Sequence, residues 1–233
     1  MNNNVAIIAF LTLLSTASHA EGMAVSAHVS LEGGGVEVTK KISDKFNARI
    51  AYRQYSYQGT DPLATLKQMG NIWTDLLGIS KSDNAYDHNG KQQLLSVMTD
   101  WYPSEAGQSR LSVGLGYNNS NDDIVGRELP LGGYNLGANH YSAAQVGKLQ
   151  GTLKYNGLAP YIGFGWGNPV AKNKEWGFVA DVGMLYQGAP KVTLSATGTA
   201  AGLQTDVATE RARLEKDTWT WTPMVSIGLS YQW

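Results

Sequence analysis

Apolar and polar residues alternate one by one from residue 219 to residue 233. The even positions are mainly small or polar, and the odd positions are Trp219, Trp221, Pro223, Val225, Ile227, Leu229, Tyr231 and Trp233. A period of two predicts a β-strand, because successive side chains of a strand point to opposite faces. One face is apolar with aromatic residues at both ends, which is typical of a strand that crosses an outer membrane between two aromatic belts.

The same alternation recurs upstream and predicts eight strands, at about residues 23–32, 35–42, 46–59, 90–103, 110–122, 147–168, 176–196 and 216–233. We therefore predict an all-β chain that forms an eight-stranded antiparallel transmembrane β-barrel of the outer-membrane type. Short and long connections alternate, which places the short turns and both chain ends in the periplasm. The last three strands exceed the membrane thickness, so we expect them to form an extracellular extension.

Some positions interrupt this pattern. Apolar residues change from odd to even positions within residues 148–168, which predicts a β-bulge at Asn156 and Gly157. Proline cannot donate a hydrogen bond to a neighbouring strand, so Pro160, Pro190 and Pro223 predict further bulges. The sequence Gly33-Gly34-Gly35 predicts a tight outer loop.

Two of the long loops have helical spacing. From Leu63 to Leu77, apolar residues recur every three or four positions, which predicts a helix that either covers the barrel mouth or packs on its outer rim. The segment from Asp206 to Asp217 is highly charged and predicts a solvated loop helix.

Residues 1–20 have the pattern of a secretory signal peptide. The apolar run from Val5 to Leu14 is shorter than the roughly 20 residues that a membrane-spanning helix needs. Ser18 and Ala20 supply the small residues of a cleavage site. We expect cleavage after Ala20, export through the Sec route and a barrel domain over residues 21–233 in the outer membrane of a Gram-negative bacterium.

Composition supports the same fold class. Charged residues make up 16% of the 233 positions, below the roughly 25% of soluble domains, and the chain has 27 Gly, 7 Trp and 12 Tyr but 4 Phe. The 18 basic and 19 acidic residues nearly cancel, which excludes nucleic acid as a partner. The chain has no Cys, which excludes disulfides and thiol chemistry.

The predicted partners follow from this setting. Outer-membrane lipid and lipopolysaccharide would surround the barrel, and the C-terminal strand would engage the barrel-assembly machinery. The aromatic residues expected at the two membrane interfaces are Trp101, Trp166, Trp176, Trp219, Trp221, Tyr231 and Trp233.

Charged residues are also predicted inside the barrel. The alternation turns Glu37, Arg49, Arg53, Asp100 and Asp181 towards the lumen. Of these, Glu37, Arg49 and Asp100 lie at similar depth on consecutive strands. They should form an ion-pair network, because an unpaired charge in a narrow interior is costly. The charges either satisfy the interior or form a gate or binding site for a small solute.

Enzymatic chemistry finds little support in the sequence. His28 is flanked by Ser26 and Ser30, but no G-x-S-x-G motif occurs and no acid is expected beside this histidine. His88 and His140 are isolated loop residues without metal-ligand spacing. The glycines of GFGWGN (residues 163–168) lie inside a strand and make room in the lumen rather than forming a phosphate loop. We therefore expect no catalytic site, metal site or cofactor.

The C-terminal part carries a family resemblance. The segments GKLQGTLKYNGLAPYIGFGWGN, WGFVADVGMLYQGAPKVTLSA and ERARLEKDTWTWTPMVSIGLSYQW resemble the CarO-type outer-membrane porins. The most specific motifs are APY-x-GFG and Y-x-G-x-PKV-x-L. The resemblance implies a small eight-stranded barrel associated with the uptake of ornithine and other basic amino acids. The alternative is a barrel without transport activity that has a structural, adhesive or surface-interaction role.

Overall fold

The computed structural model describes residues 22–30, 33–59, 85–104, 107–129, 132–171, 175–217 and 220–233. The predicted signal peptide (residues 1–20) and the predicted helix at residues 63–77 lie outside these ranges.

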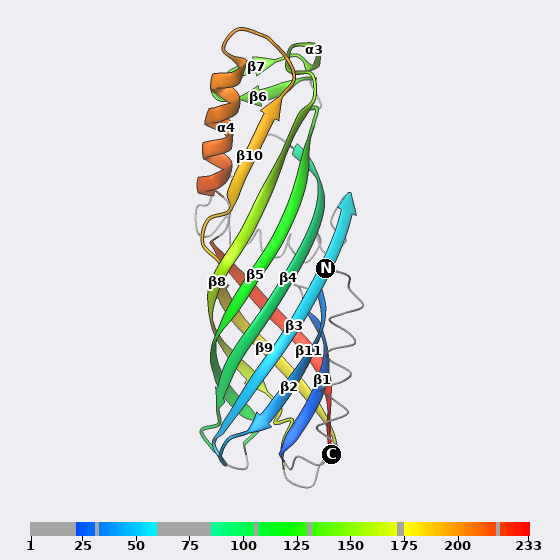
Figure 1. Cartoon of the computed structure of the whole chain (residues 1–233), viewed down its shortest axis with the longest axis vertical. Helices are drawn as coiled ribbons and strands as arrows, with labels where there is room; N and C mark the ends of the chain where they lie inside the picture. The colour runs from blue at the N-terminus through cyan, green and yellow to red at the C-terminus, as the bar shows by residue number, and fades with distance from the viewer. Residues whose placement is uncertain are drawn as a thin grey trace.

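Eight strands close into an antiparallel barrel (Figure 1). Around the barrel they follow the order β1 (Met23–Ser30), β2 (Gly33–Lys41), β3 (Phe46–Gly59), β4 (Ala85–Trp101), β5 (Ser109–Arg127), β8 (Leu149–Trp166), β9 (Trp176–Tyr186) and β11 (Trp221–Gln232), and β11 pairs with β1. The predicted fold class is confirmed. Gly33 to Gly35, expected in a loop, instead begin β2. No helix in the described ranges is long and apolar enough to span a membrane.

The outer surface of the lower barrel is apolar, as the alternation predicts. In β11, Val225, Ile227 and Leu229 expose 44%, 55% and 59% of their surface, whereas Ser226 and Ser230 are buried inside. Burying a polar face inside and exposing an apolar one is favourable only in a lipid environment.

Aromatic side chains gather at both ends of this apolar surface. Trp176 packs on Tyr231 at the end with the short turns, with 5.0 Å between ring centroids, and Tyr186 packs on Trp221 at the other end, at 4.9 Å. Trp101 and Trp166 are exposed on the strand ends beside the short turns. Trp233 is partly exposed, and Trp219 lies outside the described residues.

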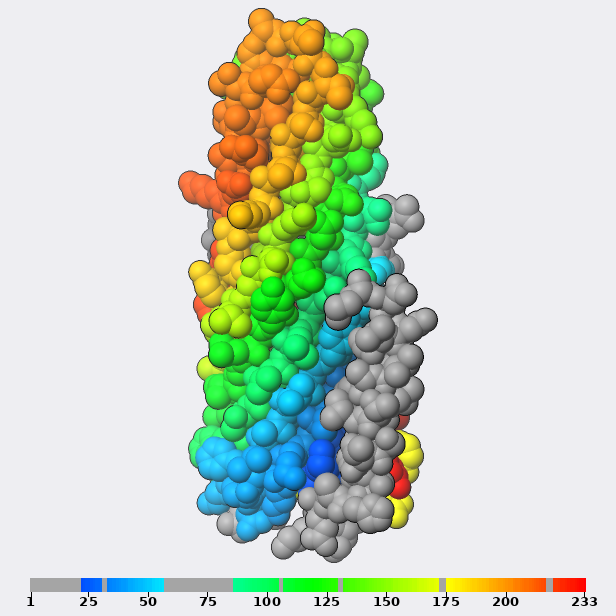
Figure 2. Space-filling view, in the orientation of Figure 1, coloured from blue at the N-terminus to red at the C-terminus, as the bar shows by residue number. Residues whose placement is uncertain are grey.

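One side of the barrel rises well above the other (Figures 1 and 2). We call this part the extension: the upper ends of β4, β5 and β8 together with β10 (Lys191–Ala196), α4 (Leu203–Asp217), β6 (Tyr134–Leu136), β7 (Asn139–Tyr141) and α3 (Ala143–Val146). The prediction that the last three strands extend was partly wrong. β11 begins only at Trp221, whereas β4 and β5 are longer than predicted.

The predicted bulge at Asn156 and Gly157 is wrong. The register between β5 and β8 is unbroken from Ser109 opposite Trp166 to Val125 opposite Gln150. The apolar residues of β8 change face because the surroundings change: Leu158 faces outward below, whereas Leu149 is buried inside the extension. Outward positions are apolar beside lipid and polar beside water, whereas inward positions in the extension are apolar because they form its core.

The prolines produce no bulges in the ladders either. Pro160 lies one residue beyond the β8–β9 ladder, which starts at Tyr161. Pro223 keeps register with β9 but lies beyond the β1–β11 ladder, which ends at Ser226. Both prolines therefore sit where one neighbouring strand is missing, so no ladder bond is lost on that side. Pro190 lies in a break that divides the predicted seventh strand into β9 and β10.

The charged segment near residue 210 forms a helix, α4, as predicted, but the helix is not simply solvated. Leu203 and Val207 are buried in an apolar cluster with Leu136, Val146 and Leu149 of the extension. Glu210 is also buried and accepts a hydrogen bond of 3.1 Å from the Tyr86 hydroxyl. Burial and the adjacent Glu210 raise the pKa of Tyr86.

Candidate functional site in the barrel lumen

Arg49 lies at the centre of a buried cluster of charges. Its Nη1 is 3.1 Å from Oε2 of Glu37, its Nε is 2.7 Å from Oδ2 of Asp100 and its Nη2 is 3.4 Å from Oδ1 of Asp181. These side chains come from β2, β3, β4 and β9, and each is at most 8% exposed. The structure thus brings together the three residues expected to pair and adds Asp181 from across the lumen.

Arg110 is the member of this cluster that sequence reasoning missed. Its Nη2 lies 2.8 Å and 2.9 Å from the two carboxylate oxygens of Asp181, and its Nη1 donates to the Gly167 carbonyl. Its Nε is 3.6 Å from Asp100. The even position of Arg110 on β5 was the available signal, because even positions of that strand face inward. We call Glu37, Arg49, Asp100, Arg110 and Asp181 the Arg49 cluster.

A hydroxyl completes the cluster. Ser112 donates to Oδ1 of Asp100 at 2.6 Å and accepts from Nη2 of Arg49 at 3.0 Å. Gly165 makes room for the guanidinium of Arg110, since a Cβ at this glycine would lie 2.6 Å from Nε of Arg110. This close approach explains Gly165, one of the glycines of GFGWGN that were expected to make room in the lumen.

Two further buried basic residues, Arg53 and His28, border the cluster beside Glu37. Arg53 is 4% exposed, and its Nε and Nη1 have no hydrogen-bond partner among the described residues. His28 has its Nε2 at 3.6 Å from Oε1 of Glu37, so the expectation that no acid lies beside it was wrong. The Ser26 hydroxyl makes no hydrogen bond in the described part of the chain, and nothing there couples it to the imidazole as a nucleophile would require.

An apolar layer fills the lumen next to the cluster. Its members are Ala51, Leu94, Met98, Ala159, Tyr161, Leu185 and Met224. Met98 contacts the cluster directly, with its Sδ at 3.9 Å from Nη2 of Arg49. Leu94 and Leu185 also line a cavity on the other side of this layer, together with polar side chains.

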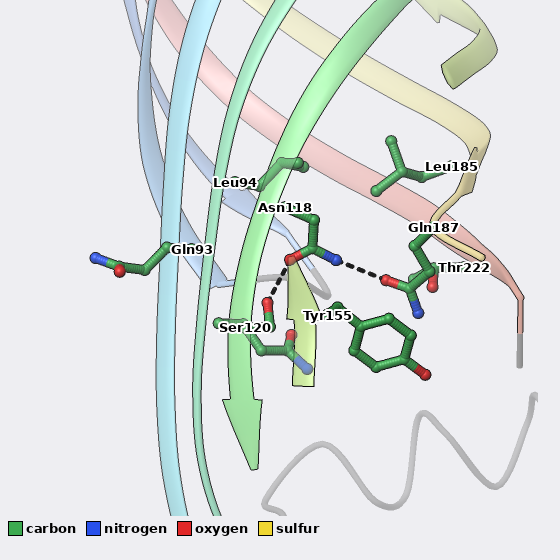
Figure 3. A pocket seen from close by; sticks show the side chains of 9 residues that line it. Gln93, Leu94, Asn118, Ser120, Tyr155, Leu185, Gln187 and Thr222 are labelled. Carbon is green, nitrogen blue, oxygen red and sulfur yellow. Dashed lines mark hydrogen bonds between the residues drawn. The ribbon is translucent and has the colours of Figure 1, made fainter. Parts of the chain in front are cut away.

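This cavity lies towards the extension and is small (Figure 3). It has a volume of about 60 Å³, far below the roughly 300 Å³ of the smaller drug-sized ligand sites. Asn118 donates to Gln187 across it at 2.8 Å and accepts from Ser120 at 2.5 Å (Figure 3). In this state, the lumen is therefore blocked at two levels, by the apolar layer and by the Arg49 cluster.

The chemistry of the site is that of ion pairing. The Arg49 cluster holds three carboxylates and two guanidinium groups, whose ion pairs have N–O distances of 2.7 to 3.6 Å. In the described ranges, no three His, Asp or Glu side chains are grouped so as to hold a metal ion.

No protein-family model and no curated protein matches the sequence. Among solved structures, the fold is similar to that of CarO from Acinetobacter baumannii, with 19% identity, a TM-score of 0.60, and coverage of 90% of this chain and 97% of that one. It is also similar to CarO2 from the same organism, with 21% identity, a TM-score of 0.60, and coverage of 91% and 99%. These likenesses confirm the CarO-type fold that the C-terminal motifs predicted.

Proposed function

We propose that the protein is an outer-membrane channel for small solutes and that the Arg49 cluster closes its lumen at rest. The observation that carries this proposal is the meeting of five buried ionisable side chains at the depth of the lipid-facing surface. Buried ion pairs are often no more stabilising than apolar packing, whereas ionisable groups within a membrane span commonly mark a solute or ion pathway.

The cluster suggests how a solute would pass. A free amino acid has a carboxylate that can replace Asp100 or Asp181 at the arginines, and an ammonium group that can replace an arginine at the carboxylates. Such an exchange separates the ion pairs without leaving a charge uncompensated in a narrow lumen. Arg53 beside the cluster offsets the third carboxylate, so net charge does not select the solute. The preference for a solute with a second ammonium group, such as ornithine, follows from the resemblance to CarO-type porins.

The proposal includes the cellular setting. Residues 1–20 would direct export through the Sec route, and the barrel would reside in the outer membrane of a Gram-negative bacterium after assembly through its C-terminal strand. The turns that follow β2, β4 and β8 would then face the periplasm, and the extension would face the outside.

One observation favours a second candidate function. The lumen is blocked by both the apolar layer and the Arg49 cluster, whereas the extension has its own apolar core under α4. A barrel with a role in adhesion or surface interaction would need a folded extension but no route for a solute through its lumen.

Uptake into liposomes separates the two functions. The refolded protein should admit radiolabelled ornithine faster than glutamate, because the resemblance to CarO-type porins implies uptake of basic amino acids. Asp181→Asn should reduce this preference, whereas the control Asp87→Asn, at an exposed acid of the extension, should leave it unchanged. Uptake of neither amino acid above empty liposomes would favour the surface-interaction function.

A further inference from the structure

Three lysines lie in one row across the outer face of the extension. Lys91 on β4 is opposite Asn121 on β5, which is opposite Lys154 on β8, which is opposite Lys191 on β10. Residues directly opposite each other in an antiparallel pair point to the same side of the sheet. We call Lys91, Lys154 and Lys191 the lysine row.

The outward direction of this row follows from the burial pattern. On β8, Lys154 and Asn156 are exposed, and they share the face that further down carries the exposed residues Leu158 and Ile162. The lysine row therefore lies on the lipid-facing side of the wall, above the apolar surface. Figure 2 shows this outer face, where β4, β5 and β8 run upward towards β10 and α4.

The row contains an unfavourable contact when nothing is bound. Lys154 and Lys191 are directly opposite each other and both are exposed. Cross-strand neighbours have Cβ atoms about 5 Å apart, and like charges in that position destabilise the sheet. Asp123, an exposed acid on this face, is one row further up and accepts a hydrogen bond from Asn121. A bound anion would relieve the repulsion between the lysines.

Amide side chains lie between the lysine row and the apolar surface. Gln54 and Gln93 are opposite each other on β3 and β4, and Asn119 and Asn156 are opposite each other on β5 and β8. Asn156 also accepts a hydrogen bond of 2.5 Å from Tyr117, an exposed aromatic residue at the upper edge of the apolar surface. Amides can donate and accept hydrogen bonds, as sugar hydroxyl groups require.

The height of the row identifies the class of ligand. Lys154 is four residues above Leu158, or about 13 Å along the strand and roughly 10 Å in height for a strand tilted by about 45°. Charged lipid headgroups extend about 5 to 7 Å beyond the hydrocarbon core, within reach of the long lysine side chains. A soluble anion has no reason to prefer this height, whereas a lipid is held there by its acyl chains.

We propose that the lysine row and the amides below it bind a phosphorylated glycolipid of the outer leaflet. The lysines pair with its phosphate groups, the amides with its sugar hydroxyl groups, and the apolar surface from Leu158 downward with its acyl chains. The site lies on the tall side of the barrel only, since β9, β11, β1 and β2 do not reach this level. It would hold the extension upright beside the membrane.

The test measures lipid binding by the full-length mature protein, refolded in detergent micelles, without any transport assay. The probes are lipid A with both phosphates, the same lipid after removal of the phosphates, an anionic phospholipid without sugars, and inorganic phosphate. Lipid A with both phosphates should bind most tightly. Lys154→Gln with Lys191→Gln should weaken its binding about 30-fold, which corresponds to about 1 kcal/mol for each lysine near a membrane surface.

A matched control has the same charge change at the other end of the barrel. Lys40→Gln with Lys45→Gln removes two exposed lysines near the short turn after β2 and should leave lipid A binding unchanged. An equal loss in both double variants would overturn the proposal, because it would show a response to net charge alone. Equal binding of dephosphorylated lipid A, of the sugar-free phospholipid or of inorganic phosphate would overturn it as well.

Discussion

Arg110 reaches Asp181 over the backbone of a glycine. Arg110 on β5 is opposite Gly165 on β8, which is opposite Asp181 on β9, so the three residues form one row across the barrel wall. The guanidinium and the carboxylate come within 2.8 Å of each other above a position that has no side chain. A Cβ at Gly165 would lie 2.7 Å from Oδ1 of Asp181, closer than side-chain atoms pack.

Gly165→Ala should therefore separate this ion pair and destabilise the barrel. We expect a loss of about 1–3 kcal/mol, which is typical of an added methyl group in a filled interior. Urea unfolding can measure it, because a closed barrel migrates faster than the unfolded chain on a gel without heating. Gly157→Ala on the same strand is the control, since nothing lies within 4 Å of a Cβ there. Equal stability of the two variants would mean that Arg110 and Asp181 do not need this gap.

The outer face of β11 offers a second prediction. Ile227 is 55% exposed at the middle of the apolar part of this strand. Ile227→Arg should cost about 2–4 kcal/mol in a lipid bilayer near its midplane, whereas Ile227→Val should be tolerated. Ser226→Arg should perturb the lumen instead, because Ser226 is buried inside. Unfolding in lipid vesicles would measure all three, and an equal cost of arginine and valine at Ile227 would contradict lipid exposure.

The barrel was predictable because its two faces meet different surroundings. Each lipid-facing residue of β11 has a polar neighbour in sequence, so the pattern alone gives the strand and its orientation. The wrong prediction of a bulge at Asn156 and Gly157 arose because the surroundings of β8 change where the extension begins. Leu149 and Leu158 are both apolar, but one is covered by the extension and the other faces lipid, and a sequence pattern does not show where the membrane ends.

Some contacts among the charges in the lumen were predictable from the sequence, and others were not. Glu37, Arg49 and Asp100 lie on consecutive strands, so local pairing was enough to bring them together in the prediction. The contact of Arg49 with Asp181 depends on closure of the barrel, because β3 and β9 are not neighbours. Distances across a lumen depend on strand tilt and stagger, which the alternation does not contain.

The extension should respond to pH through one hydrogen bond. Tyr141 donates to Oδ2 of Asp206 at 2.6 Å and links β7 to the first turn of α4. This bond, together with one from Asn139, lowers the pKa of Asp206 from 3.8, and the bond to Asp206 raises the pKa of Tyr141 from 10.0. A lowered carboxyl pKa stabilises the link above pH 3.8, and the stabilisation is lost as pH falls through the folded-state value.

The raised pKa of Tyr141 gives the opposite dependence of stability on pH. Its contribution is complete below pH 10.0 and is lost as pH rises through the folded-state value. The hydrogen-exchange protection factor at the start of α4 corrects the exchange rate for its intrinsic pH dependence. It should therefore be highest between these limits and lower on both sides. Tyr141→Phe should lower this protection factor at neutral pH and make it depend less on pH towards both limits. A profile identical to that of the unchanged protein would show that other contacts hold α4 in place.

The last prediction concerns the gate. Arg49→Ala removes the guanidinium that pairs with Glu37, Asp100 and Asp181. The loss should cost about 3–5 kcal/mol, or less where water enters, because carboxylates remain buried without their counter-charge. Arg127→Ala is the control, since Arg127 pairs with Asp87 at the surface of the extension, where ion pairs contribute little.

Conductance in planar bilayers then separates a gate from a structural role. If the Arg49 cluster is the barrier to solutes, Arg49→Ala should raise conductance and favour cations, because the remaining wall is more negative. Asp100→Asn should favour anions, because Arg49, Arg53 and Arg110 then outnumber the two remaining carboxylates. The Arg127→Ala control should do neither. If Arg49→Ala and Asp100→Asn both fold and neither changes conductance or selectivity, the charges serve the structure alone. In that case no solute passes the cluster, and the extension becomes the part of the molecule in which function must be sought.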